Sequence, residues 1–535
     1  MPNNGHILPP FPVRFGAFGY IAATGFVYFL AQVAVGTDFR VAVLFSLAIV
    51  FGLGAVHAGG GLRSAFGLLN AILLALFLPI AIFLKVLMLE PADSNLQSPL
   101  TTSFVMAFGF LALWIATALA RRFPRPKKHI LPSNYSARDY LVLSVVVLVL
   151  SFAGYLIGIS PDLEGQGLRT GGILGYARGY AAFTSFAIIP AMFYVWKSNS
   201  KRFLSHPLVL GILLLQTALG ILNTGKQQAI EPLALFGLTA VMRFGFASRK
   251  VWALGIVGAI FYVGLVYPYS QYIRFNGGRE GNAFYRVENI QDTVWRLLTD
   301  PNFRSMVSTR IESRNNLYWN SPSLAPFSRL AMVCEADRLI AATERTRSFT
   351  GWETITWGFK LMTPSVILPN KPIFGANNYL AHIAGDAAIR NTDTQWAYGV
   401  FANFYNAFGL AGVFLGSLVL FTALYYWLGL FFGNPSWAAA PVASSLNLLF
   451  LIGAFHHSLA ESSVSNQIAS FATPVLILSM ILLARGLARI FPKFPDRILL
   501  HRQARIHRLR ADRVSRLRLP DTSAIPSSGP GKQGL

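Results

Sequence analysis

Residues 403–432 read NFYNAFGLAGVFLGSLVLFTALYYWLGLFF, a run of 30 residues without a charged side chain. A helix crosses a bilayer with about 20 consecutive apolar residues, so this run predicts a membrane span. In the whole chain 54% of the 535 residues are hydrophobic and only 13% are charged, with a mean hydropathy of +0.49. Soluble proteins carry about 25% charged residues. The composition therefore excludes a multidomain soluble enzyme, a disordered chain and a fibrous repeat, and it predicts a polytopic, all-α integral membrane protein.

Further apolar runs bring the predicted number of transmembrane helices to about twelve. We expect them at residues 15–36, 41–58, 66–89, 101–120, 140–159, 179–196, 207–223, 229–246, 251–268, 403–432, 437–460 and 467–488. Cytoplasmic loops retain Lys and Arg. Basic residues follow the fourth, sixth and eighth spans, whereas residues 91–100 contain none. This pattern predicts that both termini are cytoplasmic, and the first run is too long for the apolar part of a cleaved signal peptide.

Two regions stand apart from the spans. Residues 269–402 contain apolar residues at helical spacing over 289–298 and 328–343, which predicts a small, mostly helical domain on the extracytoplasmic face. Residues 489–535 form an arginine-rich cytoplasmic tail with a disordered end. The predicted organisation is therefore 1–268 for helices 1–9, 269–402 for the loop domain, 403–488 for helices 10–12 and 489–535 for the tail. The expected core of the loop domain consists of apolar and aromatic side chains: Trp295, Leu297, Leu298, Phe303, Tyr318, Trp319, Phe327, Leu330, Ile340, Trp352, Trp357 and Phe359.

Charge and motifs narrow the function. The chain has 45 Lys and Arg against 22 Asp and Glu; in a membrane protein such an excess orients loops, and we expect no nucleic-acid partner. The single cysteine, Cys334, excludes an intramolecular disulfide and a metal site built on cysteines. The adjacent His456 and His457 cannot share one helix face as zinc ligands, and neither a Walker motif nor a nucleophile elbow occurs. Charged residues gather in 269–402 rather than inside the spans, which favours a membrane enzyme over a secondary transporter.

Three short segments carry a resemblance. Pro364-Ser-Val-Ile-Leu-Pro-Asn-Lys-Pro372 has the pattern P…P-x-K-P. A second series has the pattern T…G…Y-x-x-F-G-x-x-G and consists of Thr394, Gly399, Tyr405, Phe408, Gly409, Gly412 and Gly416. Asn223-Thr-Gly-Lys226 looks like a short S-G-K-R turn. Together with the long loop before the last few spans, these segments resemble those of bacterial oligosaccharide repeat-unit polymerases, the Wzy or O-antigen polymerase family.

The resemblance implies a GT-C-like membrane glycosyltransferase of the bacterial inner membrane, with no metal and no cofactor. Donor and acceptor would be oligosaccharide repeat units on undecaprenyl diphosphate, joined at the periplasmic face into a surface or exported polysaccharide, such as lipopolysaccharide O-antigen or an exopolysaccharide. Membrane lipid and a chain-length regulator protein are the further partners implied. Two alternatives stay open: an O-antigen ligase-like transferase that passes the glycan to lipid A-core, and a translocase or assembly subunit without catalysis.

Such a reaction needs cations for the leaving diphosphate and a group that accepts the proton of the attacking sugar hydroxyl. The expected catalytic residues are Lys371, held between Pro369 and Pro372, Arg347, which begins an R-x10-G pattern ending at Gly358, and Asp393, the proton acceptor. The expected substrate-binding residues are Arg274, Arg329, Arg338, Asp386, Tyr405, His456, His457 and Glu461.

Structural roles are the alternative for each candidate. Arg274 follows a span beside several tyrosines, as an interfacial anchor does. Arg329 and Arg338 are close enough in sequence to pair with Glu335 or Asp337. Asp393 is also suited to capping a turn or helix.

Overall fold

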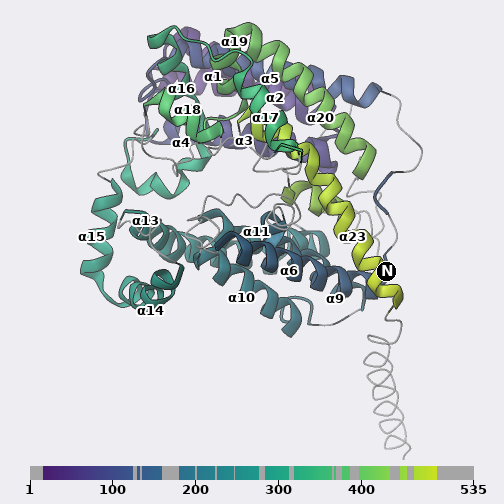
Figure 1. The fold of residues 1–535 in the computed structure, drawn as a ribbon. Coiled ribbons are helices and arrows are strands. Elements are labelled where there is room, and N and C mark those ends of the chain that lie inside the picture. Colours follow the sequence, from purple (N-terminus) through teal and green to yellow (C-terminus); the bar gives the residue numbers. More distant parts are fainter. Residues whose placement is uncertain are drawn as a thin grey trace, which may run out of the picture. The chain divides into compact units, whose positions relative to one another are not determined.

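The computed structural model describes residues 16–123, 129–132, 135–159, 180–198, 200, 202–222, 226–245, 247–275, 283–312, 318–363, 367–368, 376–385, 397–433, 446–454 and 463–490. Every regular element formed by these residues is helical, and they contain no β-strand (Figure 1). The chain divides into a unit that ends at Ala484 and a second unit that begins at Arg485. The site described below lies in the first unit.

The N-terminal helices are α1 (Gly16–Ala34), α2 (Phe39–Ala58), α3 (Ala65–Phe77), α4 (Pro79–Leu87) and α5 (Pro99–Arg122). One apolar run is interrupted between α3 and α4, where Leu78 leaves the helical conformation with φ −130° and Pro79 opens the next helix. Helices α2 and α5 pack closely because small residues face large ones. A Cβ atom on Gly54 would lie 2.7 Å from the ring of Trp114.

The next helices are α6 (Ala137–Ile159), the 3₁₀ segment η2 (Tyr180–Ala187), α9 (Ile188–Lys197), α10 (Pro207–Leu222), α11 (Lys226–Phe244), α12 (Arg249–Phe261), the π-helical turn η3 (Tyr262–Val266) and α13 (Tyr267–Phe275). Helix α12 is apolar, yet it buries none of its side chains in the protein. Ile260, for example, is 67% exposed. Large exposed apolar surfaces mark contact with a membrane or a partner, and with several other long apolar helices in the chain they indicate a membrane-embedded protein.

Between α13 and α19, the described residues form six helical segments: α14 (Ala283–Thr299), α15 (Pro301–Glu312), the 3₁₀ segment η4 (Pro322–Leu330), α16 (Met332–Thr346), α17 (Glu353–Met362) and α18 (Ala376–Ala384). The helix predicted over 289–298 is confirmed by α14. The helix predicted over 328–343 is confirmed from Met332 onward, whereas Ser328 to Leu330 belong to η4.

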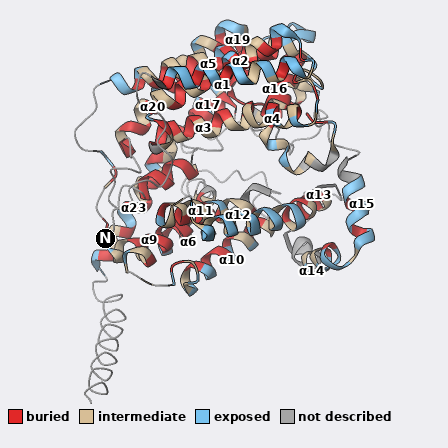
Figure 2. Ribbon diagram, turned by 180° about the vertical axis from the view of Figure 1, so that it is seen from behind, coloured by how far each residue is buried: buried red, intermediate tan, exposed pale blue. Residues whose placement is uncertain are grey.

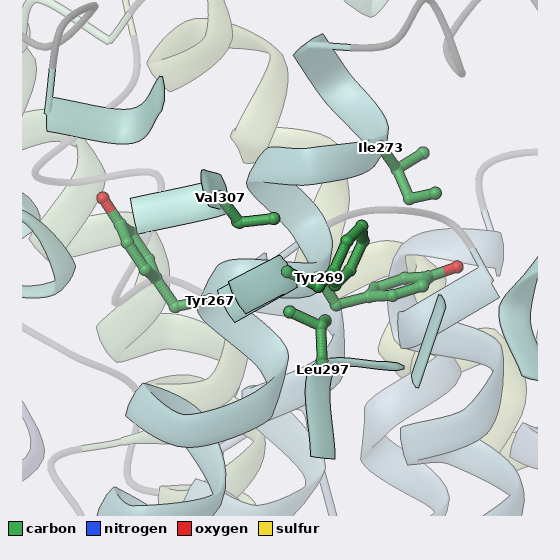
Figure 3. Close-up of a cluster of buried hydrophobic side chains, with 6 residues drawn as sticks. Tyr267, Tyr269, Ile273, Leu297 and Val307 are labelled. Atoms are coloured by element: carbon green, nitrogen blue, oxygen red, sulfur yellow. The ribbon is translucent and has the colours of Figure 1, made fainter. Parts of the chain in front are cut away.

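Helices α14 and α15 close over α13. The cluster between them consists of Tyr267, Tyr269, Ile273, Leu297, Phe303 and Val307 (Figure 3). The guanidinium of Arg304 on α15 donates to the backbone oxygen of Leu297 on α14 at 2.8 Å and 3.0 Å, which ties the two helices together. The outer surface of α15 is mostly exposed (Figure 2).

The last described helices are α19 (Val400–Ala411), the π-helical turn η5 (Gly412–Gly416), α20 (Ser417–Phe432), α22 (Val464–Ala469), the 3₁₀ turn η6 (Ser470–Ala472) and α23 (Thr473–Ile490). The predicted span over 403–432 is not a continuous α-helix. Phe408, with φ −143° and ψ 17°, and Gly409, with φ 66° and ψ −157°, break it inside α19. We call these two residues the α19 break.

Eight helical segments among the described residues are long and apolar enough to cross a membrane: Ala17–Ala34, Phe39–Ala58, Ala65–Leu87, Pro99–Arg122, Ala137–Gly154, Arg249–Ile273, Val400–Phe432 and Val464–Ile490. They coincide with eight of the predicted spans. The seventh predicted span corresponds to the 16-residue α10, the sixth is divided between η2 and α9, and the eighth, α11, carries Lys226, Glu231 and Arg243. The eleventh falls largely outside the described residues. Spans beyond the eight stay a prediction.

The predicted core of the loop domain is wrong for five of its residues. Trp295, Leu298, Phe327, Trp352 and Phe359 are exposed, whereas Leu297, Phe303, Tyr318, Trp319 and Ile340 are buried. The reason is that buried loop residues also pack against the membrane helices and their connections, as Trp319 does when its Nε1 donates to the backbone oxygen of Ala81 on α4 at 3.3 Å. The loop region therefore packs in two places, in the cluster between α13, α14 and α15 and against α4.

Candidate functional site

Helix α16 lies against α5, α18 and α19. Its apolar residues recur every three or four positions, which gives one apolar face, and all of them are buried: Met332, Val333, Ala336, Leu339 and Ile340. Packing of this face fixes the helix in rotation. The acidic residues of α16 thereby acquire defined partners on α5.

Asp337 caps the N-terminus of α5 from outside that helix. Its carboxylate accepts hydrogen bonds from the backbone N–H of Gln97 at 2.5 Å, the backbone N–H of Ser98 at 3.0 Å and the hydroxyl of Thr102 at 2.7 Å. Ser98, the N-cap residue of α5, supplies no side-chain cap of its own. These two N–H groups immediately precede the first turn of α5, where the helix dipole favours a negative charge, and the carboxylate of Asp337 lies there. Burial raises the pKa of this carboxyl, although the three hydrogen bonds oppose the shift.

Glu344 continues the same contact toward the C-terminus of α16. Its two carboxylate oxygens accept from the hydroxyls of Ser98 and Thr101, both at 2.5 Å. Glu344 and Asp337 are seven residues apart and therefore lie on one side of the helix. Two carboxylates thus fix α16 to the start of α5.

Asn406 joins α16 to the α19 break. The side chain is fully buried; its Nδ2 donates to the hydroxyl of Thr343 at 2.9 Å, and its Oδ1 accepts from the hydroxyl of Thr350 at 3.0 Å. The break leaves carbonyl groups of α19 without helical donors. The backbone N–H groups of Thr350 and Gly351 supply donors to the oxygens of Asn406 at 3.0 Å and Ala407 at 3.1 Å. The segment 347–351 therefore fills the break.

Arg347 ends α16 in the left-handed conformation, with φ 51° and ψ 26°. Its side chain is exposed. Two residues later, the Phe349 ring lies edge-on to Tyr405 of α19, with centroids 6.4 Å apart. This places a fixed backbone, one exposed cation and a buried tyrosine together beside the α19 break.

An apolar groove of about 700 Å³ borders the break. It lies between α17, α19, η5, α20 and α22, and apolar residues line it: Trp352, Ile355, Phe359, Phe404, Phe408, Ala411, Gly412, Leu415, Gly416, Val419, Leu420, Ala423, Val464, Ile468 and Phe471. Gly412 and Gly416 face Phe404, in the part of α19 before the break, and a Cβ on Gly412 would lie 2.6 Å from the Phe404 backbone oxygen. Glycine at these positions lets Phe404 pack directly against η5.

A buried ion pair contacts a second part of the loop region, around residue 320. Lys85 at the end of α4 is fully buried and lies 3.1 Å from Glu90. Its ammonium also donates to the Ser94 backbone oxygen at 3.1 Å and lies 4.7 Å from the Tyr318 ring centroid. The backbone N–H of Asn320 donates to Glu90 at 3.2 Å. The segments around 90 and 320, which the charge pattern assigned to the same face, are thus in contact.

The structure places the predicted site residues in different parts of the molecule. Tyr405 lies beside the α19 break, and Arg347 ends α16 two residues before Phe349, whose ring contacts Tyr405. Arg338 forms an ion pair with Glu335 at 3.6 Å, which is the structural role predicted as the alternative to substrate binding. Arg329 is exposed and lies on η4. Arg274 belongs to α13, and its side chain is not among those described. The remaining candidates lie outside the described residues: Lys371, Asp386, Asp393, His456, His457 and Glu461.

The residues that organise the site were not predicted. Asp337 was considered only as a local salt-bridge partner, and Glu344, Thr350 and Asn406 were not considered. Their partners are distant in sequence, up to 246 residues for Glu344 and Ser98, so no local spacing reveals them. Only Asn406 carried a usable signal, because it lies within the matching Y-x-x-F-G series.

Cys334 provides a test of the packing of α16. Burial, and next the charge of Glu335, raises the pKa of this thiol to about 12. At pH 8 the thiolate fraction is then about a thousandfold lower than for a free cysteine. We expect N-ethylmaleimide to label the native protein about a thousandfold more slowly than the same protein unfolded in dodecyl sulfate, measured by mass spectrometry. Native labelling as fast as that of the unfolded chain would show that this face of α16 is not packed.

Among the described residues, no group of three or more His, Cys, Asp or Glu side chains is arranged to hold a metal ion. Comparison of the chain with protein-family models, with curated proteins and with solved structures yields no match.

Proposed function

We propose that this protein polymerises oligosaccharide repeat units carried on undecaprenyl diphosphate, at the outer face of the bacterial inner membrane. The observation that carries the proposal is the α19 break, where the charged C-terminus of α16, an interrupted apolar helix and an apolar groove adjoin. A lipid-linked sugar has the same division into a hydrocarbon chain and a polar head. Five residues of the segment that resembles the repeat-unit polymerases contribute to this place: Tyr405, Phe408, Gly409, Gly412 and Gly416.

In the proposed reaction, a hydroxyl oxygen of the acceptor sugar attacks the anomeric carbon of the donor. The new glycosidic C–O bond forms while the bond from the anomeric carbon to the diphosphate oxygen breaks, and its electron pair leaves with the lipid diphosphate. Asp393 accepts the hydroxyl proton. Arg347 and Lys371 stabilise the negative charge that grows on the diphosphate. The groove offers the hydrocarbon chain of the substrate an apolar surface beside the α19 break.

Reconstitution tests the proposal directly. Purified protein in phospholipid vesicles is given an undecaprenyl-diphosphate-linked oligosaccharide with and without EDTA, and products are sized on a gel. We expect a ladder of lipid-linked multiples and release of undecaprenyl diphosphate in both cases. Transfer only to added lipid A-core, without chain growth, would overturn polymerisation in favour of a ligase. No release of undecaprenyl diphosphate with either acceptor would overturn a transferase altogether.

A further inference from the structure

Helix α17 has three distinct sides. At 100° per residue, the spacing of three and four residues gathers four apolar side chains into one stripe: Trp352, Ile355, Phe359 and Met362. A second, polar stripe contains Glu353, Thr356 and Lys360, all exposed. The third side consists of buried Thr354 and Gly358. One helix thus offers an apolar surface, a polar surface and a packing surface.

The packing side fixes the rotation of α17. The Ser465 hydroxyl of α22 donates to the backbone oxygen of Thr354. A Cβ atom on Gly358 would lie 2.8 Å from Ile468 and 3.0 Å from the Cα of Ser465, so the two helices touch through their backbones. Helix α22 begins the candidate span Val464–Ile490. Helix α17 is therefore held against the end of a membrane helix and cannot rotate to bury its apolar stripe.

The polar side is fixed as well. Glu353 accepts a hydrogen bond from the Tyr379 hydroxyl of α18 at 2.7 Å. The Trp357 ring contacts the same tyrosine edge-on, with centroids 5.0 Å apart. These contacts hold Glu353, at the start of the polar stripe, against α18 and leave Thr356 and Lys360 exposed.

The apolar stripe is unusually exposed for a segment outside the spans. Trp352 is 68% and Phe359 is 53% exposed. Both residues line the groove together with Leu415 and Val419, which lie in the candidate span Val400–Phe432 and are themselves exposed. The exposed surface of a membrane span faces lipid, so the stripe is continuous with a lipid-facing surface. An amphipathic helix with Trp and Phe on one side and charges on the other is typical of the membrane interface.

We infer that α17 is an interfacial helix whose stripe Trp352, Ile355, Phe359 and Met362 inserts among the phospholipid acyl chains of the adjacent leaflet, with the groove opening toward them. Glu353, Thr356 and Lys360 face water at the headgroups. The loop region is then partly immersed in lipid. It does not depend on the proposed reaction.

Site-directed spin labelling tests the inference without any substrate. Single cysteines replace Ile355, Thr356, Phe359, Lys360 and Met362 in a Cys334→Ala background, and the full chain is placed in vesicles of phosphatidylethanolamine and phosphatidylglycerol. For each label we measure the ratio of its collisions with oxygen to its collisions with a water-soluble nickel chelate. We expect this ratio to be at least fivefold higher at 355, 359 and 362 than at 356 and 360. The two polar positions serve as matched controls on the same helix.

Two results would overturn the inference. Equal access of the nickel chelate to both stripes would show that α17 projects into water. Low access of both reagents at 355, 359 and 362 would show that protein, a second copy or another segment, covers the stripe. Since no turnover is measured, either failure is distinct from a failure of the proposed polymerisation.

Discussion

Replacing Asp337 by alanine is expected to destabilise the protein by about 3 kcal/mol. The substitution removes an acceptor shared by two backbone N–H groups and one hydroxyl at the start of α5. Each buried donor left without an acceptor costs about 1–3 kcal/mol. The loss is measured as a lower midpoint in dodecyl sulfate titrations of the purified protein in mixed micelles.

Two further variants isolate the cause. Asp337→Asn keeps the acceptor for Ser98 and Thr102 but directs an amide N–H at Gln97, so about half of the loss is expected. Glu335→Ala on the same helix removes a partly exposed ion pair with Arg338 and is expected to lower stability by less than about 1 kcal/mol. A loss for Asp337→Ala no larger than that for Glu335→Ala would contradict the capping role.

The pKa of Asp337 gives the same contact a pH dependence. Because burial raises this pKa, the folded protein binds the proton more readily than the unfolded chain. The extra stability that follows from the raised pKa is fully present below about pH 4, the ordinary carboxyl pKa, and is lost as pH rises through the raised value. The hydrogen bonds that the ionised carboxylate accepts remain above that range. As pH rises through this range, the free energy of unfolding of the wild type should therefore fall relative to that of Asp337→Asn. At higher pH the difference between the two proteins should stay constant.

Hydropathy predicts the eight helices that are long and apolar enough to cross a membrane, because crossing a bilayer imposes a minimum apolar length on each helix. It could not predict the α19 break. Gly409 adopts φ 66° there, but glycine is common in membrane helices, so its presence alone does not predict a break. What stabilises the break is the segment 347–351, and its donors become partners only in the folded protein.

Apolar residues of the loop region were misassigned for a related reason. In a soluble domain, Trp352 and Phe359 would have only a protein core to enter. A membrane protein offers lipid as a second apolar environment, and sequence alone does not separate the two. The stripe on α17 and Val419 of α20 are exposed side by side. This shared exposure indicates lipid, not a protein core, as the environment of the stripe.

Arg347 connects this geometry to the proposed chemistry, and its backbone makes an unusual test possible. A non-glycine residue in the left-handed conformation costs about 1 kcal/mol relative to glycine, and Arg347 has φ 51°. Arg347→Gly should therefore leave the protein equally stable or more stable, by up to about 1 kcal/mol. If Arg347 stabilises the leaving diphosphate, the same variant should extend glycan chains at least a hundredfold more slowly, because a lost charge-stabilising donor typically removes about 3 kcal/mol of transition-state stabilisation.

Opposite changes in stability and rate separate a catalytic cation from a structural one. The measurements are initial rates of undecaprenyl diphosphate release in vesicles and the dodecyl sulfate midpoint of the same preparation. Arg345→Ala is the matched control, since Arg345 is exposed on the last turn of α16. It should change the release rate by less than twofold and the free energy of unfolding by less than about 0.5 kcal/mol. If Arg347→Gly retained wild-type release, diphosphate stabilisation would have to come from other cations. If it lost stability and rate together, Arg347 would act by holding the 347–351 segment in the α19 break.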